Sequence, residues 1–264
     1  MDRPWAFDET DIRYFTVINL LDLNQQPNAM NPVSAEDSKT LCCLCCASGP
    51  IVGKHSLPKI GYVPGEALPI KAECINHSNR NGEIFMELVQ RVSYITARKT
   101  RTISTIVAQT TKRTIGKGDS DFWTGEQITV PPLPGSGLVG CNIIHIEYFW
   151  QFVMDPSGPA INLRVPIPVI IGGIPLVSSA QQYGAPSMGG GTMLSGLALP
   201  SNVPQPSFAS YSTAMYPPGP NGQAPNAVQP ADPSDHSGDS FAPQYPYYNW
   251  NTYDSSFQPT PAAY

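Results

Sequence analysis

The sequence predicts an all-β protein, a sandwich or barrel of seven or eight short strands, followed by a disordered tail. Between about residues 41 and 176, apolar residues recur at every second position over short segments, which is the period of a half-buried strand. Turn-forming stretches rich in Gly, Pro and Asn separate these segments, and no stretch has a long helical period. Beyond residue 176, Pro, Gly, Ser and Tyr become common and charge almost disappears.

Two segments carry the alternating pattern most clearly. In "EALPIKAECIN" the residues Leu68, Ile70, Ala72 and Cys74 share one face, and in "NIIHIEYFWQFVM" the alternate residues of 144–152 do so. Between candidate strands, "YVPGE" places a proline and a glycine as a type II turn requires. The other expected strands cover residues 51–58, 84–96, 100–110, 120–130 and 161–171.

The composition divides the chain into a folded part and a tail. We expect a linker over 25–40, a β domain over 41–176 and a disordered tail over 177–264. All fifteen Lys and Arg lie at or before Arg164. The tail has too few apolar residues and charges of one sign only, so burial cannot offset the entropy lost on ordering it.

Charge and hydropathy restrict the function classes. The net charge of −5 argues against a nucleic-acid-binding surface, which needs a basic patch. The first ten residues, "MDRPWAFDET", lack the basic and apolar regions of a signal peptide. No stretch offers the ~20 uninterrupted apolar residues of a bilayer span. We therefore expect a soluble, intracellular protein with reduced cysteines.

Four cysteines, Cys42, Cys43, Cys45 and Cys46, crowd into "LCCLCC". A zinc site needs ligands from two separated pieces of chain, and the other thiols, Cys74 and Cys141, are single and far apart. Adjacent cysteines on a strand are poorly placed for disulfides, and palmitoylation usually needs a second membrane signal. Because free cysteine behaves as a small buried hydrophobe, we interpret the run as a core strand that opens the sandwich.

The sequence predicts neither an enzyme nor a cofactor site. No nucleophile elbow, zinc-protease, P-loop or dinucleotide motif occurs in a suitable setting. One basic group falls on two adjacent predicted strands, and it suggests either a solvated sheet face or a patch for acidic partners or phosphoinositide headgroups. Its members are Arg98, Lys99, Arg101, Lys112, Arg113 and Lys117.

Five motifs in order resemble those of the arrestin domain-containing proteins, or α-arrestins. They are "YFTVINLLDLN" (14–24), "LCCLCCASGPI" (41–51), "GYVPGEALPI" (61–70), "NIIHIEY" (142–148) and "LRVPIPVIIGGIPL" (163–176). The resemblance implies an immunoglobulin-like β-sandwich, the arrestin C-terminal domain, over residues 41–176. It also implies that residues 1–24 are the remnant of the end of an N-terminal arrestin domain that is otherwise missing.

The resemblance further implies a cytoplasmic adaptor that links membrane-protein cargo to transport, endocytic sorting or ubiquitination machinery, with peripheral membrane association at most. α-Arrestins typically recruit ubiquitin ligases through PPxY motifs. The tail has only Tyr216, Pro217, Pro218 and Pro220 in "YPPGP", where the required Tyr is absent. The expected partners are then the cytoplasmic parts of membrane proteins. A further partner is either a ubiquitin ligase that binds without a PPxY motif or another arrestin. The alternative function is a scaffold whose Tyr/Pro-rich tail self-associates.

Overall fold

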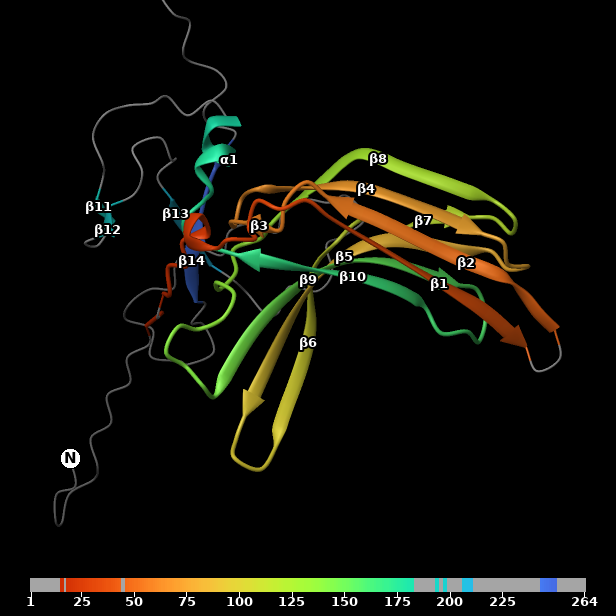
Figure 1. The fold of residues 1–264 in the computed structure, drawn as a ribbon, viewed down its shortest axis with the longest axis horizontal. Coiled ribbons are helices and arrows are strands. Elements are labelled where there is room, and N and C mark those ends of the chain that lie inside the picture. The colour runs from red at the N-terminus through yellow and green to blue at the C-terminus, as the bar shows by residue number, and fades with distance from the viewer. Residues whose placement is uncertain are drawn as a thin grey trace, which may run out of the picture.

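The computed structural model describes residues 15–16, 18–43, 46–182, 193–194, 197–198, 206–210 and 243–250. Ten strands form the body of the molecule (Figure 1). They are β1 (Val33–Cys43), β2 (Cys46–Leu57), β3 (Gly61–Tyr62), β4 (Ala67–Asn76), β5 (Gly82–Ile95), β6 (Thr100–Gln109), β7 (Arg113–Ile115), β8 (Ser120–Thr129), β9 (Ile144–Pro156) and β10 (Leu163–Ile171). The predicted all-β class is confirmed.

The strands form two facing sheets. One has the order β1-β2-β4-β8, and the other has the order β3-β10-β9-β5-β6, with β7 also paired to β5. Every pairing in these sheets is antiparallel except the short one between β10 and β3. The layers pack face to face as in an immunoglobulin-like sandwich.

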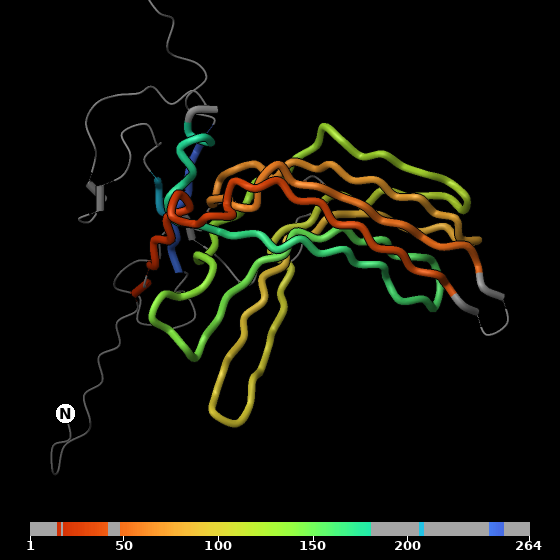
Figure 2. Tube along the Cα trace, in the orientation of Figure 1, coloured from red at the N-terminus to blue at the C-terminus, as the bar shows by residue number. Residues whose placement is uncertain are grey.

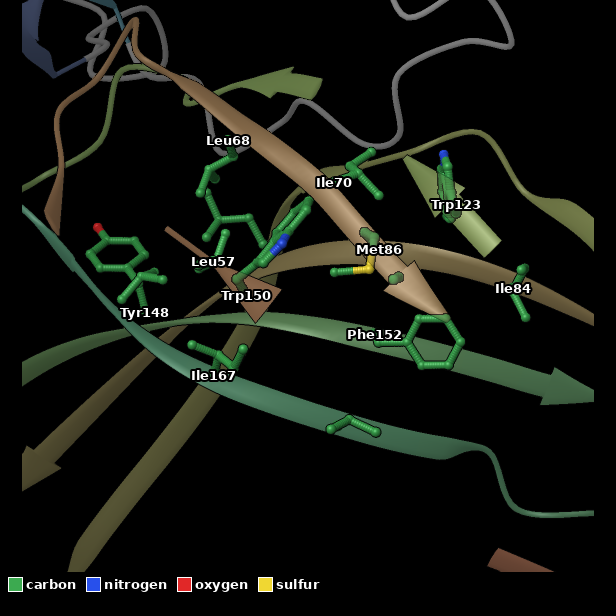
Figure 3. Packing of buried hydrophobic residues seen from close by; sticks show 14 of the residues in the cluster. Leu57, Leu68, Ile70, Ile84, Met86, Trp123, Tyr148, Trp150, Phe152 and Ile167 are labelled. Atoms are coloured by element: carbon green, nitrogen blue, oxygen red, sulfur yellow. The ribbon is translucent and has the colours of Figure 1, made fainter. Parts of the chain in front are cut away.

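The core lies between these sheets and follows the predicted alternation. Leu68, Ile70, Ala72 and Cys74 of β4 are all buried on one face. The opposite sheet contributes buried residues of β5, β9 and β10. Figure 3 shows members of the cluster from both layers in one packed group: Leu57, Leu68, Ile70 and Trp123 from the first sheet, and Ile84, Met86, Tyr148, Trp150, Phe152 and Ile167 from the second.

Strand β10 alternates buried and exposed residues along its length, with Pro166 and Pro168 on the outward positions. Proline has no N–H for a sheet ladder, so it is tolerated where one side of a strand is unpaired. Over these residues β10 pairs only with β9, because β3 joins it only at Ile170 and Ile171. The two prolines therefore lie where no strand pairs with β10 on the side away from β9.

Two boundary predictions were wrong. Residues 33–40, assigned to the linker, form most of β1, an edge strand. Within 33–40 the residues packed against the core are Val33 and Ala35, and Leu41, later in β1, is buried in that core. The cysteine run is not one strand either, since Cys43 at the end of β1 pairs with Cys46 at the start of β2. The chain reverses there without the Gly or Asn that usually marks a hairpin turn.

The chain's distant parts meet at one end of the sandwich (Figure 1). There, a 3-10 turn, η1 (Leu23–Gln25), follows a bridge between Asp22 and Ile174. The helix α1 (Val177–Gln182) extends the chain beyond β10. Strand β14 (Gln244–Tyr247) pairs with β13 (Ser207–Ser210), and β11 (Met193–Leu194) pairs with β12 (Leu197–Ala198).

Within the tail, predicted as disordered over 177–264, the structure describes elements at 177–182, 193–194, 197–198, 206–210 and 243–250. Tyr248 and Trp250 are buried at the end of the sandwich, and this apolar area favours ordering the segment that carries them. No helix long and apolar enough to span a lipid bilayer occurs among the residues that the structure describes.

Candidate partner-binding surface

The β5–β6 hairpin stands out from the body of the sandwich (Figure 2, yellow). Its register is continuous near the tip, where Val92 faces Ile103 and Ile95 faces Thr100. The Thr96 amide donates 3.0 Å to the Lys99 carbonyl oxygen, and the Thr96 hydroxyl donates 2.7 Å to the same oxygen. These bonds close the turn and give the tip a defined shape.

The tip combines unneutralised cations with apolar side chains. Arg98, Lys99 and Arg101 are exposed, and none of them forms an ion pair with another described residue. On the same hairpin, Tyr94 and Ile103 are 43% and 41% exposed. A surface of this composition is suited to an acidic segment that also carries apolar residues.

The other three members of the predicted basic group lie elsewhere. Lys112, Arg113 and Lys117 follow the far end of β6, whose ten residues separate them from the tip by roughly 30 Å at the rise of a strand. Lys112 is paired with Glu83 at 2.8 Å, and this hydrogen bond raises the pKa of Lys112. The six residues therefore do not make one patch.

Partners also neutralise Arg113. Its guanidinium lies 3.3 Å from the Asp121 carboxylate and over the Trp123 ring at 5.1 Å. Since a paired cation adds little to the potential of a surface, the predicted patch reduces to Arg98, Lys99 and Arg101.

A rigid base holds the hairpin. At its root, Arg91 donates 3.0 Å to Glu147 and lies over the Phe149 ring at 4.2 Å. One layer deeper, Gln90 donates 2.8 Å to the Tyr148 hydroxyl, which donates 2.7 Å to the Pro134 carbonyl oxygen. These contacts fix the direction in which the tip points.

Farther along β5, the buried Glu87 carboxylate accepts three side-chain hydrogen bonds. Its donors are Gln109 at 3.1 Å, Gln151 at 2.7 Å and Arg164 at 2.9 Å. A buried carboxylate is tolerated when its lone pairs are satisfied in this way. The network ties β6, β9 and β10 to β5 and completes the rigid base.

The remaining candidate residues lie outside the described residues. These are Tyr216, Pro217, Pro218 and Pro220 of the tail and the side chains of Cys42, Cys43, Cys45 and Cys46. Among the residues that the structure does describe, no three His, Cys, Asp or Glu side chains gather closely enough to hold a metal ion. Sequence reasoning missed the apolar part of the tip, although "SYITARKTRTISTI" places Tyr94 and Ile103 close to the cations along the chain.

Comparisons with known proteins agree on one family. Residues 47–176 match the model of the arrestin (or S-antigen) C-terminal domain. The chain is 31% identical over 175 residues to arrestin domain-containing protein 4 of Mus musculus, covering 66% of this chain and 41% of the relative. It is 29% identical over 185 residues to arrestin domain-containing protein 17 of Caenorhabditis elegans, covering 67% of this chain and 42% of the relative.

A third relative covers more of this chain. Arrestin domain-containing protein 1 of Homo sapiens is 31% identical over 204 residues, which is 77% of this chain and 46% of the relative. The chain thus spans about two fifths to one half of the length of these relatives.

Proposed function

Because this chain belongs to the family of arrestin domain-containing proteins, we propose that it works as a non-enzymatic adaptor. In this role the sandwich binds cytoplasmic parts of membrane-protein cargo and links them to transport, endocytic sorting or ubiquitination machinery. The observation that carries the proposal is the β5–β6 hairpin, which presents three unneutralised cations and exposed apolar side chains on a rigid base.

The chemistry of the tip supports this choice of partner. Arginine and aromatic side chains are common at protein interfaces, and cations speed the encounter with acidic segments. Such a partner is an extended stretch of cytoplasmic protein with acidic and apolar residues. In this proposal the protein is cytoplasmic and is recruited to the plasma membrane or endosomes through its cargo.

The test compares two triple variants of the full chain as baits on native membranes. Arg98→Ser, Lys99→Ser and Arg101→Ser remove three charges from the tip, whereas Lys54→Ser, Lys71→Ser and Lys117→Ser remove three charges elsewhere. We expect the tip variant to recover at least about fivefold less membrane protein, equivalent to about 1 kcal/mol, and the control to match the unmodified chain. A cytoplasmic peptide from a recovered protein is then titrated against all three chains.

If the two triple variants recover equal amounts of membrane protein, the hairpin is not the cargo-binding surface. If the unmodified chain recovers no more membrane protein than a tag-only bait, the chain does not bind cargo. The scaffold alternative makes a different prediction: concentration-dependent condensation of residues 177–264 alone. The docking of Tyr248 and Trp250 on the sandwich favours the adaptor, because the two aromatics are withdrawn from association between tails while they are docked.

A further inference from the structure

A second hydrophobic cluster lies at the end of the sandwich, separate from the main core. It combines residues from distant parts of the chain: Leu23, Ala29, Val63, Leu176, Ala180, Tyr248 and Trp250. The first five come from η1, from the loops beside β3, from the residue that precedes α1 and from α1 itself. Tyr248 and Trp250 come from the tail, more than 60 residues beyond the end of α1 at Gln182.

Tyr248 is held by both its backbone and its side chain. Its amide donates 3.0 Å to the Pro64 carbonyl oxygen, and its hydroxyl donates 2.7 Å to the Gly173 carbonyl oxygen. Burial raises the pKa of this hydroxyl, which keeps it protonated as a donor. The site therefore selects tyrosine by shape and by one buried acceptor.

Gly65 makes the close approach possible. Its φ is +92°, and a Cβ there would lie 1.9 Å from the Tyr248 carbonyl oxygen. Any side chain at this position would collide with the backbone of the tail segment. The turn thus leaves room for a peptide backbone directly above it.

The tail segment binds through alternate residues, as an extended peptide does. Pro246, Tyr248 and Trp250 are buried, whereas Tyr247 is half-buried and Asn249 is exposed. The Tyr248 and Trp250 rings stack with centroids 5.9 Å apart. Over residues 246–250 the alternate buried side chains supply the contact and the residues between them are more exposed, which is the arrangement of peptides that dock on sheet edges and grooves.

The contact is not close-packed throughout. A small cavity remains between the tail segment and the body, lined by Tyr245 and Pro246 on one side and by residues of 18–19, 133–138 and 172–173 on the other. Among the described residues, no member of the main core lies beyond Ile171, so the tail segment adds none of its side chains to that core. The tail segment packs on the outside of a domain whose main core it does not join, and it leaves a cavity at the contact. A bound peptide ligand packs in the same way.

We propose that the groove formed by Pro64–Glu66, Gly173–Leu176 and α1 is a recognition site for uncharged extended peptides of the type Pro-x-Tyr-x-Trp. Residues 246–250 fill it in cis as an exchangeable ligand. A partner segment with the same spacing competes for the groove. This inference does not depend on the cargo role of the hairpin.

The first test uses the full chain with Tyr248→Ala and Trp250→Ala, which vacates the groove, and a peptide of residues 242–251. We expect micromolar binding to this variant. Binding to the unmodified chain should be at least tenfold weaker, because a tethered segment competes at an effective concentration of roughly millimolar. A peptide with Tyr248→Phe should bind about fivefold more weakly than the parent peptide, since it lacks the bond to Gly173.

The second test closes the groove. Gly65→Ala should speed amide exchange in residues 243–250 of the unmodified chain, and in the vacated chain it should abolish binding of the peptide. The matched control is Gly140→Ala, because Gly140 has a similar φ of +81° and nothing within 4 Å of its Cβ position. It should leave exchange in 243–250 and peptide binding unchanged.

Several outcomes overturn the proposal. If the Tyr248→Ala, Trp250→Ala chain loses its cooperative unfolding transition, the segment belongs to the core and is no ligand. If the peptide binds neither chain, or binds both equally, the groove is not the site. If the unmodified chain forms a dimer that these substitutions abolish, the segment acts in trans on a second copy and the assignment in cis is wrong.

Discussion

His55 Nε2 lies 2.7 Å from the carbonyl oxygen of Val165, and the bond joins the two layers of the sandwich through its core. Because a carbonyl oxygen only accepts, Nε2 carries the proton. Nδ1 is then unprotonated, and it is buried with no hydrogen-bond partner among the described residues. Burial of the ring lowers the pKa of His55 to about 4, against a weaker opposing effect of the bond to Val165.

This pKa predicts a loss of stability in acid. The unfolded chain takes up a proton at His55 as the pH falls below 6.5, whereas the folded chain does not until about pH 4. The contribution of His55 is therefore intact above pH 6.5 and should decline by about 3 kcal/mol by pH 4. Denaturant unfolding of the chain and of His55→Gln across this range measures the difference.

A matched control for this experiment is His77→Gln, which replaces an exposed imidazole. It should leave the pH dependence of unfolding as it is in the unmodified chain. If His55→Gln also keeps that dependence, the acid sensitivity arises from another group.

The turn that begins β4 depends on a buried ion pair. Glu66, 2% exposed, accepts hydrogen bonds from the Lys59 ammonium and from the Val63 amide at 3.1 Å, and Lys59 also bonds the Ser179 hydroxyl of α1. Removing one partner of a buried pair leaves the other charge uncompensated. We expect Glu66→Ala to lower the free energy of unfolding by about 3–5 kcal/mol.

Two variants calibrate that measurement. Glu66→Gln keeps an acceptor for the Val63 amide and should cost less. Glu36→Ala breaks the exposed pair with Lys54, whose atoms are 3.5 Å apart, and should cost less than about 1 kcal/mol. A Glu66→Ala effect as small as that of Glu36→Ala would contradict the structural role of the pair.

The buried thiol of Cys74 should be inert. Burial raises its pKa to about 12, and the nearby charge of Asp121 adds to the shift. Since the thiolate is the reactive form, alkylation at pH 8 should be roughly a thousandfold slower than for an ordinary exposed cysteine. Peptide mapping by mass spectrometry compares Cys74 with the half-buried Cys141, and equal rates in the folded chain would refute the prediction.

The tail should not recruit ligases through WW domains. A WW groove takes two prolines as a polyproline ridge and the tyrosine that follows in its own pocket, whereas Pro217 and Pro218 are followed by Gly219 and Pro220. We expect a peptide of residues 205–264 to bind such domains no tighter than a scrambled peptide. Micromolar affinity by calorimetry, lost with Pro217→Ala and Pro218→Ala, would show that a variant motif operates.

Strand positions and faces were predictable because burial alternates locally. The buried faces of residues 68–74 and 144–152 could be predicted without knowing which strands they pair with. The turn at Gly65 was predictable for the same reason, and its φ of +92° with a 3.0 Å bond from the Glu66 amide to the Val63 carbonyl oxygen confirms it.

The errors lie where structure depends on distant residues. Strand β1 is polar over 33–40 because an edge strand gains most from its ladder with β2, which no local pattern reveals. The docking of Tyr248 depends on acceptors at Pro64 and Gly173, far away in the sequence. The predicted basic group does not form one patch, because the length of β6 separates Arg98 and Lys99 at the tip from Lys112 and the residues after it.

The prolines of β10 limit how copies of this protein can associate. Unbounded fibre growth through a sheet needs two complementary free edges, one at each side. Pro166 and Pro168 remove two donors from the β10 edge, so an incoming strand finds an interrupted ladder there. Among the described residues, pairing through the six-stranded sheet then favours the β6 edge, and two copies that pair there leave no second uninterrupted edge of this sheet for a third copy.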